Sequence, residues 1–332
     1  MKKIAGRVRL AIIGAGGIAG AHVKGILAHR EKVECVALCD VSQENLKTRN
    51  EQLGGGAALY GDWRVMLKEM GKDIDAVDIC LPHHLHAPAI LDAAAAGKHI
   101  LCEKPMCISL KEAEQIAAAV KKSGVTYMSA HNQLFMPVVT ETRKLIDAGT
   151  IGRVLHVRSQ DCFRAKLETF RGKWRANLKL QGGGELIDTG YHPTYRLIHL
   201  AGSTVTGVRA SMGRYYQEIE GEDTAAVQVR FANGVIGEIL TSWAFALPYG
   251  THQIHVVGEK GQIFGSGSTL HLLPMGYSEP AKMALPAADT FAEEIAHFAT
   301  CLQTGTRPIH SVEEGRQVLE IILAAAKDAP VA

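Results

Sequence analysis

Residues 12–27, IIGAGGIAGAHVKGIL, decide the fold expected for the N-terminal half of the chain. Gly14, Gly16 and Ala19 follow an apolar run and precede a helical pattern, in the spacing G-x-G-x-x-A. The first glycine permits a tight turn, the second lets the backbone approach a pyrophosphate, and the small third residue lets helix and strand pack closely. A helix N-terminus there offers free N–H groups to phosphates. The expected cofactor-binding residues of this turn are Gly14, Gly16, Gly17, Ile18 and Ala19.

Around this stretch, short apolar runs alternate with helical patterns from Arg9 to Ala130. The runs are RLAIIGAG, VECVALCD, AVDICLP, HILCEKP and VTYMSAH. Runs rich in Val, Ile and Leu and bounded by Gly, Asp or Pro are typical of strands buried on both faces. A helix expected after the fourth run begins with a capping box at Ser109 and Glu112 and ends at Gly124. The fold class is therefore α/β, with a doubly wound parallel sheet, a Rossmann domain, over residues 1–128.

The pattern changes after about residue 150. The stretch TAAVQVRF alternates apolar and polar residues, Asn233-Gly234 is a hairpin signal, and VIGEILTSWAF follows as the return strand. A second hairpin is expected in IHVVGEKGQIFG, and helices in TFAEEIAHFATCLQTG and SVEEGRQVLEIILAAAKDA. Residues 129–332 are therefore expected to form an α+β domain with an open, mainly antiparallel sheet.

Composition excludes several classes of protein. A length of 332 residues suits about two domains. The 36 basic and 34 acidic side chains are spread along the chain, which argues against nucleic-acid binding. The seven cysteines form no C-x-x-C pair, as expected for reduced cysteines in a cytoplasmic protein. No apolar run approaches the roughly 20 residues of a membrane span. The first residues also fit a signal peptide, but the glycine motif gives them another use.

Asp40 ends the second predicted strand, about 20 residues after Ala19. A carboxylate at this spacing takes the adenosine ribose hydroxyls of a dinucleotide. It would also repel a 2′-phosphate, and the following Val41-Ser42 supplies no arginine to receive one. The sequence therefore favours NAD over NADP.

Three histidines follow the third predicted strand in LPHHLHAP. A metal site would need a carboxylate or cysteine as a further ligand beside the histidines. This stretch does not offer one, so no metal is expected. The carboxyl ends of parallel strands face the cofactor in this fold class. Pro82, His83 and His86 are therefore expected to bind the cofactor, whereas His84 fits an ordinary surface position.

Glu103-Lys104-Pro105 ends the next apolar run. An apolar strand end is a place where the charge of Lys104 is partly desolvated, which favours the neutral amine and suits it to act as an acid or base. Glu103 and Lys104 are expected beside the cofactor. The alternative is a strand cap with a solvated ion pair.

The stretch GGGELIDTGYHPTYRLIHLAG holds a second acid and base. Asp188 and His192 are four residues apart and would share one face of a helix, where an ionised aspartate can orient the imidazole and raise its basicity. The alternative is a solvated surface pair. Pro193 is tolerated in the first turn of a helix, so a helix beginning close to His192 would point that side chain into a cleft.

These motifs together resemble the Gfo/Idh/MocA family of oxidoreductases. They are the glycine turn, Glu103-Lys104-Pro105, Trp174-Arg175 before the glycine run, and Asp188-x-Gly190-x-His192 after it. The resemblance implies a Rossmann domain, a second domain with an open antiparallel sheet, and NAD(P)-linked hydride transfer at a sugar or cyclitol hydroxyl. It further implies that Lys104 and His192 flank the reacting carbon as catalytic residues, with Asp188 orienting or hydrogen-bonding the substrate. The exposed sheet face would pair subunits into a homodimer or homotetramer.

Two positions depart from the family pattern and leave the substrate open. The family often has an arginine two residues after an asparagine where this chain has Asn132 and Leu134, and an aspartate where it has Tyr195. No run of Arg and Lys in the second half marks a phosphate pocket, which favours an unphosphorylated substrate. The expected substrate contacts are Asn132, Arg164, Trp174, Arg175, Asp188 and His192.

The function expected from these features is NAD-dependent oxidation of a secondary hydroxyl of a sugar, glycoside or cyclitol. Lys104 and His192 would handle the proton. Two alternatives remain open: a glycoside hydrolase that retains NAD and acts by transient oxidation, and a non-catalytic sensor of sugars or dinucleotides.

Overall fold

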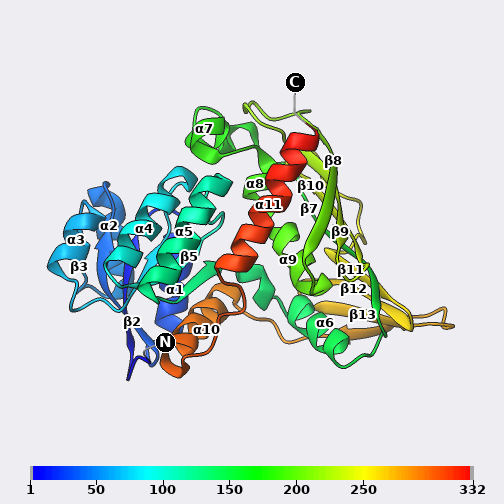
Figure 1. Ribbon diagram of the computed structural model, residues 1–332, viewed down its shortest axis with the longest axis horizontal. Coiled ribbons are helices and arrows are strands. Elements are labelled where there is room, and N and C mark those ends of the chain that lie inside the picture. Colours follow the sequence, from blue (N-terminus) through cyan, green and yellow to red (C-terminus); the bar gives the residue numbers. More distant parts are fainter. Residues whose placement is uncertain (1–2, 330–332) are drawn as a thin grey trace. The chain divides into compact units, whose positions relative to one another are not determined.

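The computed structural model describes residues 3–329, and its contacts divide the chain into two compact units. The strands of the first unit are β1 (Val8–Ile13), β2 (Val33–Cys39), β3 (Ala58–Tyr60), β4 (Ala76–Ile79), β5 (His99–Glu103) and β6 (Tyr127–Ala130). They form one parallel sheet in the order β3-β2-β1-β4-β5-β6. Figure 1 labels β2, β3 and β5 of this sheet. The order reverses beside β1, which is the arrangement of a doubly wound sheet and confirms the expected Rossmann fold.

Helices connect these strands as the parallel pairing requires. They are α1 (Ala19–Ala28), α2 (Gln43–Leu53), α3 (Trp63–Glu69), α4 (His86–Ala95) and α5 (Leu110–Ser123), with a short 3₁₀ helix η1 (His83–Leu85) before α4. The capping box of α5 is confirmed, because Glu112 N donates to Ser109 Oγ and its carboxylate accepts from Ile108 N. Gly124 ends α5 with φ of 69°. Two elements between β2 and β4 were not predicted from the sequence. Strand β3 has only three residues, and α2 has the polar sequence QENLKTRNEQL, which buries Leu46 alone and so lacks apolar periodicity.

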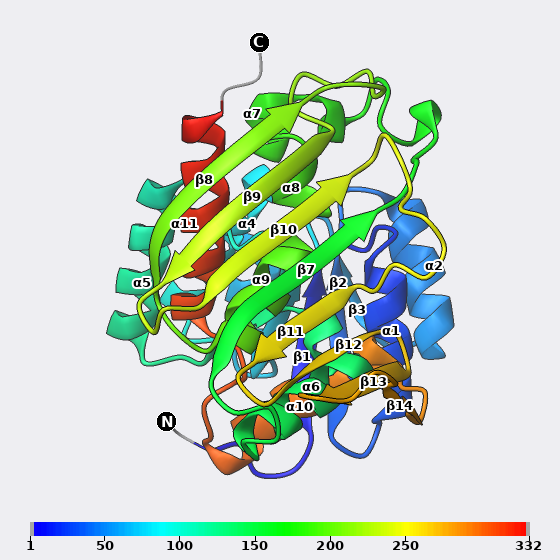
Figure 2. The same ribbon diagram turned by 90° about the vertical axis from the view of Figure 1, so that its right-hand side faces the viewer.

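The second unit is built on an eight-stranded sheet (Figure 2). Its strands are β7 (Val154–Cys162), β8 (Val205–Gly213), β9 (Thr224–Phe231), β10 (Ile236–Ser242), β11 (Ile254–Gly258), β12 (Gly261–Ser266), β13 (Thr269–Pro274) and β14 (Ala281–Ala284). The order is β14-β13-β12-β11-β7-β10-β9-β8, and every neighbouring pair is antiparallel except β7 with β10. Both expected hairpins, β9 with β10 and β11 with β12, are present.

Helices of the second unit cover one face of this sheet. They are α6 (Pro137–Asp147), α8 (Glu185–Asp188), α9 (Tyr191–Ala201) and the later part of α11 (Val312–Asp328). The short helices η2 (Asn132–Phe135), η3 (Leu167–Thr169), η4 (Trp174–Ala176) and α7 (Leu178–Gln181) lie in the connections. Along β9, Ala225, Val227 and Val229 are buried, whereas the residues between them are exposed. This alternation of period two marks a sheet with one covered and one open face.

The division between the units differs from the expected boundary after residue 128. The first unit comprises residues 1–132 and 289–316, and the second comprises residues 133–288 and 317–332. The expected second domain therefore loses α10 (Thr290–Thr304), which packs against α1. Gly25 of α1 permits this approach, because a Cβ there would lie 3.0 Å from the carbonyl oxygen of Phe291.

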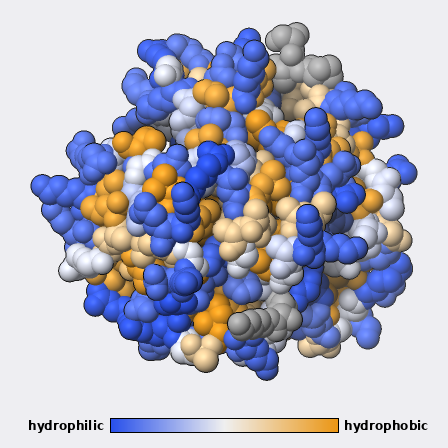
Figure 3. Space-filling view, turned by 60° about the vertical axis from the view of Figure 1, so that its left-hand side comes forward, coloured by the Kyte–Doolittle hydropathy of each residue, from blue (hydrophilic) through white to orange (hydrophobic). Residues whose placement is uncertain are grey.

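Across the part of the chain that the structure describes, no helix combines the length and apolar character needed to cross a membrane. On the face drawn in Figure 3, apolar residues form small groups among hydrophilic ones.

Candidate active site

The glycine turn between β1 and α1 has the shape that its sequence predicts. Gly14 adopts φ of 95°, and a Cβ there would lie 2.5 Å from the carbonyl oxygen of Cys80. A Cβ on Gly16 or Gly17, in contrast, would meet no heavy atom within 4 Å. Ala19 is fully buried at the start of α1. The turn is therefore tight on its inner side and open on its outer side, which fits the close approach of a dinucleotide pyrophosphate.

Asp40 and Arg49 hold this turn from two sides. Asp40 follows β2, and its Oδ2 accepts a hydrogen bond from Ala15 N at 2.7 Å while its Oδ1 accepts one from Ser42 N at 2.7 Å. Arg49 of α2 donates from Nε to the carbonyl oxygen of Ala15 at 3.2 Å and from Nη2 to that of Gly16 at 3.0 Å. The sequence pointed to Asp40 but missed Arg49, which lies on a helix without apolar periodicity.

The loop after β4 carries Pro82, His83 and His86. His83 is 3% exposed, and its ring centroid lies 6.0 Å from that of His86. His86 is fully buried, with Nδ1 2.6 Å from the carbonyl oxygen of Pro105 and Nε2 2.7 Å from that of Leu81. Burial lowers the pKa of His86 in spite of these two carbonyl contacts. In the structure, His86 therefore joins the loop after β4 to the loop after β5.

Glu103 ends β5 as a buried residue, so the alternative of a solvated ion pair does not describe it. Its Oε2 accepts a hydrogen bond from Lys104 N at 3.0 Å, and its Oε1 lies 3.0 Å from Nε2 of His22. Nδ1 of His22 lies 2.8 Å from Oδ2 of Asp78 on β4. Neither His22 nor Asp78 was among the residues predicted from the sequence. A polar residue inside the buried run AVDICLP, and a histidine within the glycine stretch itself, were the available signals.

Charge and burial oppose each other in this chain of contacts. Burial alone would lower the pKa of His22, but the neighbouring Asp78 and Cys80 raise it well above its ordinary value. Burial alone would raise the pKa of Glu103, but His22 and Lys104 hold it below its ordinary value. Both shifts favour the charged forms, an imidazolium beside a carboxylate.

Several of the predicted residues thus follow strand ends at one edge of the first sheet, because parallel strands end at the same edge. Lys104 is half-buried directly after β5, and Asn132 follows β6, where its Nδ2 donates to Thr290 Oγ1 at 3.1 Å. The predicted residues that follow β1, β2, β4, β5 and β6 are Gly14, Asp40, Pro82, Lys104 and Asn132.

In the second unit the structure brings Trp174, Arg175 and Asp188 together. Arg175 Nε donates to Asp188 Oδ2 at 2.7 Å, and the guanidinium carbon lies 4.5 Å from the centre of the Trp174 ring. Asp188 is 5% exposed. A buried carboxylate paired with a stacked arginine is a fixed group that can accept a hydrogen bond from a ligand hydroxyl.

His192 is the second residue of α9, which confirms the expected helix start. Its Nδ1 lies 2.7 Å from the hydroxyl oxygen of Tyr195, and that oxygen accepts from Gln133 N at 3.1 Å. Tyr195, one of the departures from the family pattern, therefore contacts the predicted catalytic imidazole directly.

The expectation that Asp188 and His192 share one helix is wrong. Helix α8 ends at Asp188 and α9 begins at Tyr191. Gly190 lies between them in tight packing, since a Cβ there would lie 2.7 Å from Leu186 Cα. At the break, Gly190 N donates to the carbonyl oxygen of Glu185 at 3.0 Å, five residues back, which departs from the i to i−4 pattern of an α-helix.

The glycine run before α8, residues 182–184, lets the backbone lie close to that of residues 221–222. A Cβ on Gly184 would lie 2.1 Å from the carbonyl oxygen of Glu222, and one on Gly221 would lie 2.6 Å from Gly184 Cα. The Glu222 carboxylate accepts from Gly184 N at 3.1 Å and from Leu186 N at 3.0 Å. The run thus lets Glu222 satisfy the first N–H groups of the helix that carries Asp188.

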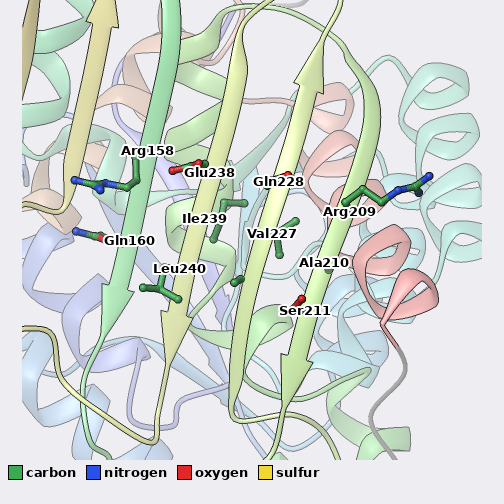
Figure 4. A pocket seen from close by; sticks show the side chains of 11 residues that line it. Arg158, Gln160, Arg209, Ala210, Ser211, Val227, Gln228, Glu238, Ile239 and Leu240 are labelled. Carbon is green, nitrogen blue, oxygen red and sulfur yellow. The ribbon is translucent and has the colours of Figure 1, made fainter.

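Arg164 makes none of the contacts described above, and none of them involves the open face of the second sheet. Arg164 is exposed, with its guanidinium carbon 4.1 Å from the centre of the Tyr216 ring. A depression of about 480 Å³ lies on the open face of the second sheet, and strands β7 to β10 line it with side chains that include Arg158, Gln228 and Glu238 (Figure 4). None of the predicted site residues lines this depression.

Two family models match the chain and together cover more than half of it. The model described as "Oxidoreductase family, NAD-binding Rossmann fold" matches residues 8–131, and that of the "GFO/IDH/MocA C-terminal domain" matches residues 139–264. The chain belongs to the Gfo/Idh/MocA family of oxidoreductases. NAD is therefore the cofactor of its first unit, in agreement with the glycine turn and Asp40.

Similar members of the Gfo/Idh/MocA family act on cyclitols and aldoses. The chain is 27% identical to myo-inositol 2-dehydrogenase of Thermotoga maritima, over 96% of each protein. It is 28% identical to scyllo-inositol 2-dehydrogenase (NAD(+)) of Bacillus subtilis, over 96% of this chain and 93% of that protein. The crystal structure of aldose-aldose oxidoreductase from Caulobacter crescentus, complexed with glycerol, is similar with a TM-score of 0.85 and 27% identity over 97% of each chain.

Proposed function

We propose that this family member is an NAD-dependent dehydrogenase that oxidises a secondary hydroxyl of a sugar, glycoside or cyclitol. The observation that carries the proposal is the placement of Lys104. The residue follows the end of β5, at the same sheet edge as the glycine turn, and the buried Glu103 holds its backbone N–H. Relatives named as inositol dehydrogenases support the choice of substrate class.

In this proposal the NAD site is formed by residues at the strand ends. Gly14, Gly16, Gly17, Ile18 and Ala19 take the pyrophosphate, Asp40 takes the adenosine ribose, and Pro82, His83, Glu103 and Lys104 lie along the nicotinamide side. His86 contributes by joining the two loops that bear them. The cofactor, when bound, supplies the acceptor for a hydride.

Lys104 and His192 handle the hydroxyl proton. One of them accepts it as the carbon is oxidised, and the other hydrogen-bonds the same oxygen. Asp188, fixed by Arg175, orients the substrate through a neighbouring hydroxyl. Asn132, Trp174 and Arg175 contribute further contacts to an unphosphorylated ring polyol, and Arg164 is the most exposed of the proposed contacts.

The test is NADH formation by the purified protein with a panel of inositols, free sugars and glycosides, run in parallel with NADP. Turnover of one ring polyol, with NAD preferred, is the expected result. No turnover across the panel would overturn the proposal. If the purified protein were then found to retain NAD, the function would instead be that of a hydrolase acting by transient oxidation or of a sensor.

We further propose that the open face of the second sheet pairs copies of the chain into a homodimer or homotetramer in the cytoplasm. Leu240 is half-buried on β10 and lines the depression on this face. Leu240→Glu should therefore shift the mass in solution, measured by light scattering, to that of a monomer. A monomeric wild-type protein would exclude the pairing.

A further inference from the structure

A cluster of titratable side chains lies under the sheet edge of the first unit, apart from the residues proposed to meet substrate. His22 of α1 is its centre and is fully buried. It is faced by Asp78 of β4, by Cys80 directly after β4, by Glu103 of β5 and by Glu294 and the Phe291 ring of α10. All four of these titratable neighbours are buried.

The positions of the two carboxylates favour a charged His22. Nδ1 lies 2.8 Å from an oxygen of Asp78 and Nε2 lies 3.0 Å from an oxygen of Glu103. A neutral imidazole has one N–H, and an ionised carboxylate only accepts. If both carboxylates are ionised, both contacts are hydrogen bonds only when both ring nitrogens carry protons, so the geometry points to an imidazolium shared by two carboxylates.

A bound metal ion does not explain the cluster as well. Ligand atoms of His22, Asp78 and Cys80 lie within 4.8 Å of one another, which is a spacing a metal could use. However, Nδ1 of His22 is already at hydrogen-bond distance from Asp78. Burial, together with the charge of Asp78, also raises the pKa of Cys80 to about 12, so binding of a metal would first have to displace the thiol proton.

We propose that His22 is a positioning residue for Lys104, acting through the carboxylate of Glu103. One Glu103 oxygen accepts from the His22 imidazolium, which sets the rotamer of the carboxylate. The other oxygen accepts from Lys104 N at 3.0 Å, which fixes the backbone that bears the amine. These two contacts, from His22 to Glu103 and from Lys104 N to Glu103, form a relay. The relay connects the loop that carries Lys104 to α1, the helix that begins at the glycine turn.

Removing the imidazolium would leave two buried carboxylates without their shared counter-ion. Glu103 would then take up a proton or rotate away from Asp78, and either change disturbs its bond to Lys104 N. Glu294 provides a contrast within the same cluster. Burial raises its pKa well above the ordinary value, which favours the neutral carboxyl, so we expect Glu294→Gln to leave the charge of the cluster unchanged.

The proposal rests on the proposed function only in taking Lys104 as the proton-handling group, and the first measurements need no substrate. In ¹⁵N-histidine-labelled wild-type protein at pH 8, His22 should show protons on both ring nitrogens, assigned by their loss in His22→Gln. A single N–H on His22, or one equivalent of zinc in the purified protein, would overturn the proposal.

The link to Lys104 is tested in protein labelled with ¹³C at lysine Cε. The Lys104 signal, assigned by its loss in Lys104→Met, should move in His22→Gln and stay in place in Glu294→Gln. An unmoved signal in His22→Gln would exclude the relay. If the wild-type protein lacked dehydrogenase activity, the proposed function would fail while these measurements still decided the role of His22.

Once a substrate is known, His22→Gln should change kcat without changing the affinity for NAD. Misplacement of a catalytic group by about 1 Å can cost about 100-fold in rate. His22→Gln should therefore lower kcat by about 10- to 100-fold, change the shape of the pH–kcat profile, and leave the Kd for NAD within about twofold of the wild type. Equal losses in kcat and NAD affinity would indicate general damage to the unit and contradict a positioning role.

Discussion

Oδ2 of Asp40 lies 2.7 Å from the backbone nitrogen of Ala15, at the centre of the glycine turn. The carboxylate that is expected to take the adenosine ribose therefore also holds the turn that takes the pyrophosphate. Because Arg49 binds the carbonyl oxygen of the same residue, the Ala15 backbone is held at both its N–H and its C=O. We therefore expect binding of the two parts of the cofactor to be coupled through this one side chain.

Asp40→Ala should weaken NAD binding by about 10- to 100-fold, because hydrogen bonds to charged groups contribute about 1.5–3 kcal/mol each. Asp40→Asn, which keeps an acceptor oxygen for Ala15 N, should lose less. Calorimetric titration with NAD and NADP measures both effects. Glu44→Ala, which removes an acid from the first turn of α2, is the matched control and should bind NAD as the wild type does. Equal NAD affinity in Asp40→Ala would rule out the coupling.

Lys104→Met should lower turnover by at least about 100-fold and leave the Kd for NAD within about threefold. The substitution removes the amine but keeps a long unbranched side chain, and proton transfer by a positioned group contributes about 10²- to 10⁴-fold. Steady-state kinetics and NAD titration separate the two quantities. The exposed Lys111→Met serves as the control. Comparable turnover in Lys104→Met would remove this residue from the chemistry.

Glu294→Gln should stabilise the protein at high pH but not at low pH. Burial raises the pKa of Glu294 in the folded state, so the folded protein keeps a proton that the unfolded chain releases above the ordinary glutamate range. Stability is therefore lost as pH rises from that range through the raised pKa. The variant should gain about 2–4 °C in Tm at pH 8, the equivalent of about 1 kcal/mol, and nothing near pH 4. A lower Tm than wild type at pH 8 would show that Glu294 is ionised in the fold.

Gly184→Ala should destabilise the second unit by about 3 kcal/mol or more, because the new Cβ would overlap the carbonyl oxygen of Glu222 at 2.1 Å. Gly207→Ala is the matched control, since a Cβ on this β8 residue would meet Arg230 at an ordinary 3.9 Å. Urea unfolding of both variants measures the difference. If both variants unfolded at the same urea concentration as the wild type, the close contact at Gly184 would be refuted.

The first unit was predictable because its signals are local. Five of its six strands are short apolar runs, and the glycine turn and Asp40 stand at fixed distances from those runs. The sixth strand, β3, has only three residues and was not predicted. Arg49 and the contact between His22 and Asp78 were not predictable in this way. They join residues that are 34 and 56 positions apart in the sequence, and no periodicity marks such pairs.

The second unit was predictable in part. Asn233-Gly234 and the alternation in β9 indicated a hairpin, which the structure contains. The parallel pairing of β7 with β10 has no local signal, because a whole segment of the chain separates the two strands. A spacing of four residues suggested one helix over Asp188 and His192, but the chain forms two, and Gly190 between them bonds five residues back to Glu185.

The return of α10 to the first unit has a consequence for synthesis of the chain. The first 132 residues leave the ribosome long before residues 289–316, which complete the same unit. Until then the side of α1 that bears Gly25 lacks the helix that covers it. The nascent dinucleotide-binding unit would therefore remain open to chaperones throughout synthesis of the second sheet, and a fragment ending at residue 132 would be a poor substitute for the intact unit.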